Sequence, residues 1–350
     1  MFGLLRTIFA VMVASYHLFY PMTALGVYPV FGFYVISGYL MTLILQERYG
    51  YSSRGRSIFA INRFLRIYPQ YWASASVSVL LIYLLGNEFV RHINTTIFLP
   101  KTPLAIGQNI FLAFLAWEPG NVIPRLVPPT WTLTVEIIFY GLIGAGISRS
   151  FTRTKIWFSF SVVYVIGSYV IGLPWVDRYA PCLAASLPFS MGAGIYFLTT
   201  EHSRASKLLL KIPASLWFLF TLGNCLLFGR VPINSALGEV GFYFNLIFCT
   251  LLVYRVAQGG KIFPLCEKLD RQIGNFSYPI YILHAQAGIL ASFLFFDQGD
   301  TSLIHRLVNL LTAFVILFFL SQIFIIVLDN PIHRIRTKLK DKMLVSTHVE

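Results

Sequence analysis

Long apolar segments alternate with short polar segments along nearly the whole of this chain. Most of the apolar segments contain about 20 residues, which is the length that a helix needs to cross the hydrocarbon core of a bilayer. Hydropathy predicts about ten membrane-spanning helices, at 4–25, 28–46, 70–87, 131–148, 156–173, 181–199, 213–228, 238–256, 276–296 and 304–328. The pattern therefore predicts an all-α, polytopic integral membrane protein.

One further apolar segment, 104–117, is too short to cross a membrane comfortably, so we expect it to be re-entrant or interfacial. It belongs to 88–130, the longest stretch predicted on the outer side, which contains several prolines. Because proline fixes φ and removes a backbone donor, we expect a folded cap there rather than a helix. The longest predicted loop on the inner side is 47–69.

Basic residues outnumber acidic ones, with 27 Lys and Arg against 14 Asp and Glu and a net charge of +13. They lie between apolar segments rather than on one amphipathic face, so no nucleic-acid partner is expected. With a cytoplasmic N-terminus, the outer side holds only Arg91, Lys101, Arg125, Arg178, Arg230 and Arg306. This asymmetry follows the positive-inside rule and predicts that both chain ends are cytoplasmic.

The composition, 57% hydrophobic and only 12% charged, excludes a soluble globular protein. We expect one transmembrane domain over residues 1–333 and a basic cytoplasmic tail over 334–350. The first apolar segment lacks a small-x-small cleavage site and is expected to be a retained helix. Four cysteines without metal or redox spacing are expected to be buried, and no metal site is predicted; they are Cys182, Cys225, Cys249 and Cys266.

Two ionisable residues stand out in the first apolar segment, Arg6 and His17. Eleven residues along a helix advance about 16 Å and turn roughly 20° past three full turns, so the two share one face. Arg6 is then expected near the membrane edge and His17 near the midplane. Ionisable groups at such depth are costly and usually mark a functional site.

Further polar residues follow in the next segments. Gly38 is expected to allow close helix packing, and Ser37 beside it either packs or forms a polar wall of a site. Arg63 and Arg66 lie on one side of a helical turn just before a span, on the inner side. Guanidinium groups bind phosphate bidentately, so with Arg6 they would hold an anionic cytoplasmic ligand. Alternatively, they are topology signals or lipid-headgroup contacts.

A carboxylate inside the span that begins near Trp131 points to function more strongly. Glu136 lies about 8 Å below the start of this span, and no cation precedes it there. We expect it to act in catalysis or to orient a partner.

Toward the C-terminus, Tyr278, Tyr281 and His284 recur every three residues and form a polar stripe along one helix. His284 has either a direct role or a structural one, satisfied by a neighbouring hydroxyl. Asp329 with Pro331 is interpreted first as a helix stop and second as part of the inner mouth of a site.

Taken in order, these motifs resemble those of membrane acyltransferase family 3, a family of O-acyltransferases. The motifs are Arg6 and His17 separated by ten residues, Phe33-Tyr-Val-Ile-Ser-Gly-Tyr39, Arg63-x-x-Arg66-x-x-Pro69, Trp131-Thr-Leu-Thr-Val-Glu136-x-x-Phe-Tyr140, Ser277-Tyr-Pro-Ile-Tyr-Ile-Leu-His284 and Asp329-Asn-Pro331. The resemblance implies ten spans, an acyl-coenzyme A donor that binds from the cytoplasm, and transfer of an acetyl or similar group to a hydroxyl.

The resemblance also implies roles for individual residues. The histidine that matches His17 is essential in the family, and Arg6, Arg63 and Arg66 match arginines linked to donor binding. Asp329 departs from the Glu found in many members. The chain lacks the extracytoplasmic hydrolase-like domain that some members carry, so it is expected to act alone or with a separate extracytoplasmic partner.

Elementary chemistry fits these roles. Histidine accepts and returns a proton near neutral pH, so His17 can take the proton of an acceptor hydroxyl while that oxygen attacks the thioester. Glu136 or a hydroxyl would fix the tautomer of the imidazole. An acyl-histidine intermediate is the alternative to direct transfer.

The sequence thus predicts a membrane-bound O-acyltransferase of the bacterial inner (plasma) membrane. The acyl-CoA donor is a co-substrate, and no tightly bound cofactor is expected. The predicted acceptor is a sugar hydroxyl of a cell-surface polysaccharide or lipopolysaccharide, so the partners are acyl-CoA, a glycan or glycolipid, and membrane lipids. The alternatives are a transporter or flippase of a glycan or lipid, or an acyltransferase with a lipid or small-molecule acceptor.

Overall fold

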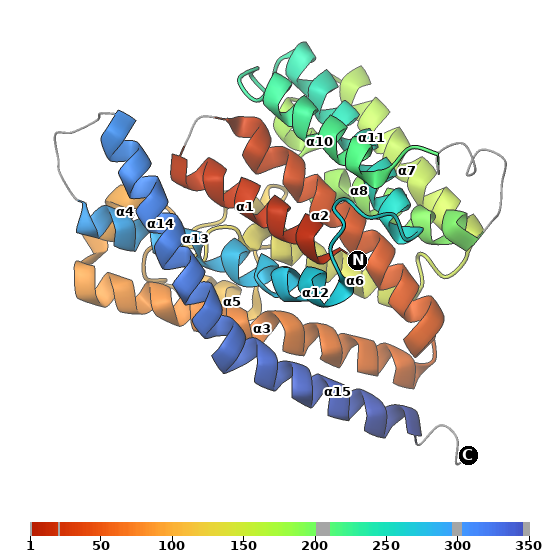
Figure 1. The fold of residues 1–350 in the computed structure, drawn as a ribbon, viewed down its shortest axis with the longest axis horizontal. Helices are drawn as coiled ribbons and strands as arrows, with labels where there is room; N and C mark the ends of the chain where they lie inside the picture. Colours follow the sequence, from red (N-terminus) through yellow and green to blue (C-terminus); the bar gives the residue numbers. More distant parts are fainter. Residues whose placement is uncertain (1, 20–21, 201–210, 296–302, 346–350) are drawn as a thin grey trace.

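The computed structural model describes residues 2–19, 22–200, 211–295 and 303–345, and every regular element in them is a helix. The predicted all-α fold is therefore confirmed. The α-helices are α1 (Gly3–Phe19), α2 (Thr23–Ile44), α3 (Ser53–Leu85), α4 (Asn87–Ile93), α5 (Pro103–Phe111), α6 (Thr130–Ala145), α7 (Phe151–Val170), α8 (Cys182–Thr200), α10 (Ala214–Phe228), α11 (Ala236–Ala257), α12 (Glu267–Asn275), α13 (Ser277–Leu294), α14 (Leu303–Phe324) and α15 (Asn330–Val345) (Figure 1).

Each predicted membrane-spanning segment coincides with one of these helices. Within the described ranges, four helical segments are long and apolar enough to cross a membrane, Thr23–Tyr49, Trp175–Thr200, Ala236–Ala257 and Arg306–Lys338. A fifth exists if α3 and α4, bent by 119° at their junction, form one broken span. Several other predicted spans, among them α1, α6 and α10, are shorter apolar helices. Ten crossings with both ends cytoplasmic stay a prediction.

The predicted inner loop 47–69 is wrong for most of its length. The segment Leu45–Tyr49 forms a π-helical turn, and α3 starts at Ser53 after the Ser52 hydroxyl accepts a hydrogen bond from the amide of Gly55 at 3.1 Å. This N-cap explains why the helix starts there. With 33 residues α3 is about 50 Å long, well beyond the roughly 30 Å of a bilayer core. Arg63 and Arg66 therefore lie inside a rigid helix.

The predicted helix stop at Asp329 and Pro331 is also wrong. A π-helical turn at Ile325–Asp329 continues directly into α15, and the amide of Asn330 donates to the carbonyl of Ile325. Proline is tolerated in the first turn of a helix because its missing donor has no partner to lose there. The predicted tail is consequently helical from its start and runs beside α3 (Figure 1).

The first helix is shorter than the predicted span 4–25, because α1 ends at Phe19. His17 therefore lies in its last turn, and its expected depth near the midplane of the membrane stays a prediction.

The stretch 88–130 forms a folded cap that includes α4 and α5. α5 has nine residues and is about 14 Å long, too short to cross a membrane. The Asn109 side chain holds the cap together: its amide donates to the carbonyls of Ala105 and Pro124, and its oxygen accepts from the amide of Leu126 at 2.9 Å. Ser78 of α3 donates to the Leu126 carbonyl at 2.5 Å, so the cap is tied to α3.

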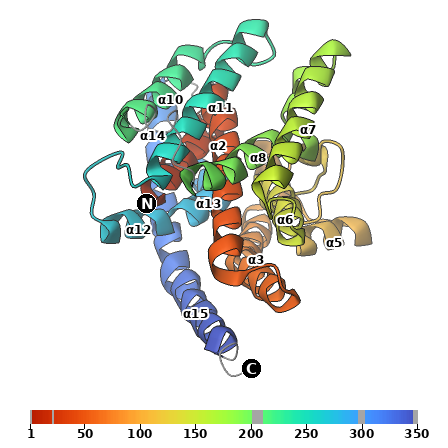
Figure 2. The same cartoon turned by 90° about the vertical axis from the view of Figure 1, so that its right-hand side faces the viewer.

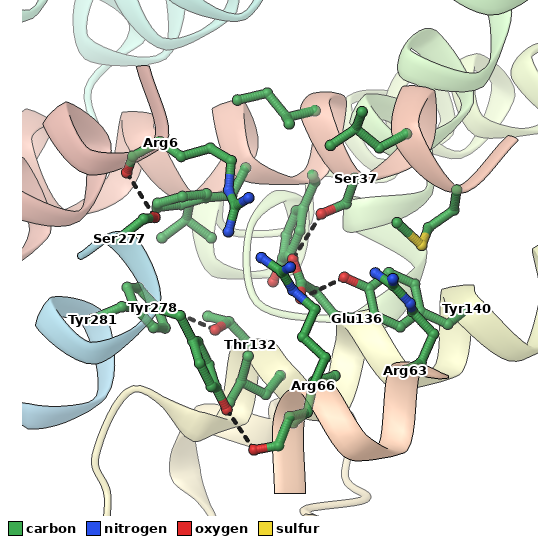
Figure 3. Close-up of a pocket in the computed structure, with 18 of the residues that line it drawn as sticks. Arg6, Ser37, Arg63, Arg66, Thr132, Glu136, Tyr140, Ser277, Tyr278 and Tyr281 are labelled. Atoms are coloured by element: carbon green, nitrogen blue, oxygen red, sulfur yellow. Dashed lines mark hydrogen bonds between the residues drawn. The ribbon is translucent and has the colours of Figure 1, made fainter. Parts of the chain in front are cut away.

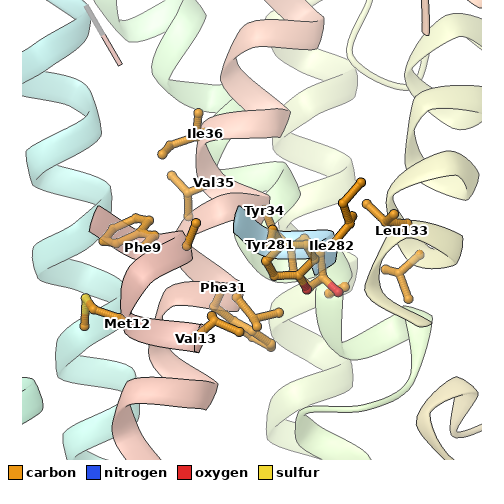
Figure 4. Packing of buried hydrophobic residues seen from close by; sticks show 14 of the residues in the cluster. Phe9, Met12, Val13, Phe31, Tyr34, Val35, Ile36, Leu133, Tyr281 and Ile282 are labelled. Carbon is orange, nitrogen blue, oxygen red and sulfur yellow. The ribbon is translucent and has the colours of Figure 1, made fainter. Parts of the chain in front are cut away.

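The centre of the protein is formed by α1, α2 and α13 (Figure 1), with α7, α10 and α11 on the side of α2 away from α3 and α15 (Figure 2). Phe9 and Val13 of α1 and Phe31 and Val35 of α2 belong to one buried cluster (Figure 4). Of the cysteines predicted to be buried, Cys225 and Cys249 are; Cys182 is partly buried and Cys266 is exposed.

Small residues bring the backbones of α2 and α8 together. A Cβ on Gly38 would lie 2.2 Å from the carbonyl oxygen of Phe189, and a Cβ on Gly192 would lie 2.0 Å from that of Val35. Lipid chains are as apolar as the helix surfaces, so close packing of this kind is what holds membrane helices together. The predicted packing role of Gly38 is confirmed, and the contact fixes the position of Ser37 beside it.

The start of α1 is anchored by α12. The amides of Gly3 and Leu4 each donate to a carboxylate oxygen of Asp270 at 3.0 Å. Thr7 donates to the carbonyl of Ile273 at 2.7 Å. A carboxylate at a helix N-terminus satisfies free amides and complements the helix dipole. The anchor sets the place of the helical turn that carries Arg6.

We predict that Gly192→Ala destabilises the protein. The added methyl group must push α8 away from α2, and overpacking of this kind typically costs about 1–3 kcal/mol. Thermal unfolding in detergent, followed by intrinsic fluorescence, would measure it. The matched control is Gly194→Ala on the same helix, where the new Cβ meets nothing within 4 Å. Equal unfolding midpoints for the two variants would contradict the proposed contact.

We also predict a pH-dependent effect of Asp270→Ala. Burial on its own raises the pKa of Asp270, but hydrogen bonds to its oxygens, among them those from the amides of Leu4 and Gly3, help to hold the pKa below the ordinary 3.8. The contribution of the carboxylate to stability is thus present above pH 3.8 and is lost as the pH falls through the lowered pKa.

At pH 7, Asp270→Ala should lower the unfolding midpoint by about 2 °C, as for the loss of a helix cap. The difference from the unaltered chain should shrink as the pH falls below 3.8. Glu267→Ala, at an exposed position of the same helix, is the control and should change little. A difference that does not vary with pH would show that the carboxylate charge is irrelevant.

Candidate functional site

A cavity with a volume of about 160 Å³ lies between α1, α2, α3, α6 and α13 (Figure 3). Five separate helices contribute polar side chains to it. The polar lining consists of Arg6, Tyr34, Ser37, Arg63, Arg66, Thr132, Glu136, Tyr140, Ser277, Tyr278 and Tyr281. The apolar remainder comes mostly from α2, so the site is a polar chamber inside a hydrophobic bundle.

Glu136 is the one carboxylate in the described lining, and hydroxyl groups hold it. Ser37 donates to one of its oxygens at 2.9 Å, and Tyr140 donates to the other at 2.9 Å. Glu136 and Tyr140 are four residues apart, so they lie on one face of α6. Ser37 comes from α2, which settles the choice left open by the sequence: it forms a polar wall of the cavity.

Three guanidinium groups share this cavity with the carboxylate. Figure 3 shows Arg6 reaching into the cavity from α1 and Arg66 reaching from α3 toward Glu136. Arg63 enters beside Tyr140, and its Nε is buried without a hydrogen-bond partner in the described part of the chain. With three positive groups and one negative group, the lining carries a formal excess of two positive charges.

In the described ranges, the two arginines that are buried outside the cavity have their own partners: Arg125 donates to the backbone carbonyls of Gly120, Val122 and Pro128, and Arg178 has a carboxylate. Arg178 pairs with Glu239 at 2.6 Å, and its guanidinium stacks 4.0 Å from the ring centre of Tyr169. Among the described residues, no carboxylate lies within ion-pair distance of the three cavity arginines. Buried charges are normally paired. The excess in the cavity therefore points to an anionic ligand.

The tyrosines of the predicted polar stripe close one side of the cavity. Tyr278 donates to the carbonyl of Ile67 in α3 at 2.9 Å, and Tyr281 and Thr132 share a hydrogen bond of 2.6 Å. Ser277 donates to the backbone carbonyl of Arg6 at 3.1 Å and joins α13 to α1. These contacts join α13 to α3, α6 and α1 around the cavity.

The two histidines form a pair of their own next to this wall. Their rings stack with centroids 5.1 Å apart and an angle of 17° between the planes. His284 is buried, and its Nδ1 has no hydrogen-bond partner among the described residues. His17 is exposed. Neither ring lines the cavity, but Tyr281 lies between, with its ring 6.4 Å from that of His284.

Asp329 is not part of the cavity lining. It accepts a hydrogen bond from the Gln70 side chain at 2.9 Å, which links the π-helical turn before α15 to α3. The sequence placed it at the inner mouth of the site as a second interpretation. Its observed contact instead ties two helices together beside the arginine-bearing part of α3.

The structure thus brings together seven of the ten residues singled out in the sequence, namely Arg6, Ser37, Arg63, Arg66, Glu136, Tyr278 and Tyr281. Sequence reasoning missed Tyr34, Thr132, Tyr140 and Ser277 as lining residues. The signal for two of them was present, since positions 132, 136 and 140 repeat every four residues on one helix face. In the described residues, no group of three or more His, Cys, Asp or Glu side chains suits a metal ion.

A known protein family matches most of the chain. The sequence model of the family described as an acyltransferase domain matches residues 2–329. No curated protein and no solved structure matches the chain. Because the family match covers almost the whole helical bundle, including every element that lines the cavity, the chain belongs to membrane acyltransferase family 3, a family of polytopic membrane proteins.

Proposed function

We propose that the protein transfers an acetyl or similar short acyl group from cytoplasmic acyl-CoA to a sugar hydroxyl of a bacterial surface polysaccharide or lipopolysaccharide. The observation that carries this proposal is the cavity with three arginines and one hydroxyl-bound carboxylate in an acyltransferase domain. Membership of an acyltransferase family implies transferase activity, and it disfavours the transporter and flippase alternatives.

The charge of the cavity suits the donor. Coenzyme A carries phosphate groups, and the planar guanidinium group binds phosphate through paired hydrogen bonds. A cavity of 160 Å³ is smaller than the roughly 300–1,000 Å³ of sites for drug-sized ligands, so it accommodates only part of this large molecule. In the proposed complex, the arginines hold an anionic part, and the acyl-bearing arm extends past Tyr281 toward the histidines.

The proposed chemistry uses His17 as a general base. Its imidazole takes the proton of the acceptor hydroxyl as the oxygen attacks the thioester carbonyl; the C–O bond forms and the C–S bond breaks. The departing thiolate then receives a proton from the imidazolium. Such assistance is worth about 10²–10⁴-fold in rate. The stacked ring of His284 restricts the orientation of the His17 ring.

The contacts of Glu136 favour a role other than the one expected from the sequence. The sequence allowed it to fix the tautomer of His17, but both of its oxygens accept hydrogen bonds from Ser37 and Tyr140. We propose instead that it balances part of the positive charge of Arg6 and Arg66, with which it interacts electrostatically. An uncompensated row of arginines in an apolar bundle would be costly before the donor binds.

We expect His17→Ala to lower the acyl content of surface glycans by at least about 100-fold, because the base that activates the acceptor is lost. Mass spectrometry of glycans from cells that carry the unaltered chain, the variant or neither would measure this. His333→Ala, at an exposed position of α15, is the matched control. Unchanged acylation in the His17 variant, at equal protein level, would overturn the proposed role.

The proposed donor site leads to a separate prediction. Arg66→Gln should weaken acetyl-CoA binding by about ten- to a hundredfold, because a hydrogen bond to a charged group is worth about 1.5–3 kcal/mol. Calorimetric titration of the purified protein in a neutral detergent would measure the affinity. Arg271→Gln, at an exposed position of α12, should bind acetyl-CoA normally. If both variants bind equally well, the cavity does not hold the donor.

A further inference from the structure

The C-terminal helix α15 lies beside the arginine-bearing half of α3, although it follows the last residue of the family match (Figure 1). Arg336 makes the contact: its Nε donates to the side-chain oxygen of Asn62 at 3.4 Å. Asn62 is buried and directly precedes Arg63, which lines the cavity. Arg336 is thus held just outside the cavity wall.

Arg336 differs from the other basic residues near it. Arg334 and Lys338 on the same helix are exposed, whereas Arg336 is partly buried. Its charged neighbours include Arg66 and Asp329, and Asp329 already accepts a hydrogen bond from Gln70. No ion pair of Arg336 is found in the described residues. A partly buried arginine held next to another arginine is unfavourable unless an anion lies between them.

The helix against which Arg336 packs adds to the positive field. α3 carries four arginines and no acidic residue, and Arg54, Arg56, Arg63 and Arg66 all lie in its first half. Since α3 is longer than a bilayer core is thick, a span formed by it leaves part of the helix outside the core. With α15, the first half of α3 forms a basic surface beside the lining residues Arg63 and Arg66.

The cavity is too small for the whole donor, so the proposed complex needs a binding surface outside it. At 160 Å³ it cannot enclose a whole coenzyme A molecule, so most of the donor lies outside the wall. The nucleotide end of the donor carries phosphate groups and needs cationic partners there. Arg336 is the cation that the described residues place beside the lining residue Arg63.

We propose that Arg336 binds a phosphate group at the nucleotide end of the acyl-CoA donor and so extends the donor site onto α15. This inference rests on the proposed function. A lipid headgroup also presents phosphate, and the shared chemistry is recognition of a phosphate group by a guanidinium. The bound donor would hold α15 against α3. The C-terminal helix is then part of the donor-binding site.

The test compares acetyl-CoA with S-acetylpantetheine, which keeps the thioester arm but lacks the nucleotide. Full-length protein in neutral detergent would be titrated with each, as the unaltered chain and as Arg336→Gln and Arg334→Gln. Arg336→Gln should raise the Kd for acetyl-CoA by about tenfold and leave that for S-acetylpantetheine unchanged. Arg334→Gln removes the same charge from an exposed position and should change the Kd by less than about twofold.

Three results would overturn the inference. They are an unchanged Kd for acetyl-CoA in Arg336→Gln, an equal loss for both compounds, or a loss seen only as weaker binding to phosphatidylglycerol vesicles. The last would assign the residue to lipid headgroups. If the unaltered chain does not bind acetyl-CoA at all, the proposed function fails as well, so the two failures are distinguishable. Equal unfolding midpoints of both variants would show that the fold is intact.

Discussion

The site depends on the cost of placing charge inside an apolar helical bundle. Three guanidinium groups enter one cavity, and the single carboxylate of Glu136 offsets only part of their charge. In the same protein Arg178 and Glu239 form a close pair, so the bundle can neutralise a buried arginine when the charge is structural. Unbalanced positive charge of this kind favours an anionic ligand.

The rest of the architecture keeps these charged groups in place. The backbone contact between α2 and α8 at Gly38 sets the position of Ser37, which holds Glu136. Asp270 fixes the start of α1 and with it the turn that carries Arg6. Arg63 and Arg66 lie on the long, continuous helix α3. Together, these features keep the three arginines close to one another.

Much of the site was predictable because helix periodicity carries short-range geometry. Glu136 and the stripe at Tyr278 and Tyr281 were recognisable as polar positions in apolar helices, and they do face one cavity. The errors arose where a boundary depended on context. Polar residues before the apolar part of α3 were interpreted as a loop, and Pro331 as a helix stop, because hydropathy does not register an N-cap or a π-helical turn.

The sequence by itself determined the helical class, the family and the residues of interest, because apolar length and motif order are local properties of the chain. Only the tertiary structure decided which of those residues meet. In it, His17 stacks on His284, the oxygens of Glu136 accept hydrogen bonds from Ser37 and Tyr140, and α15 contacts Asn62. Residues more than a few turns apart are brought together by helix packing, whose angles and contacts depend on all the surfaces at once.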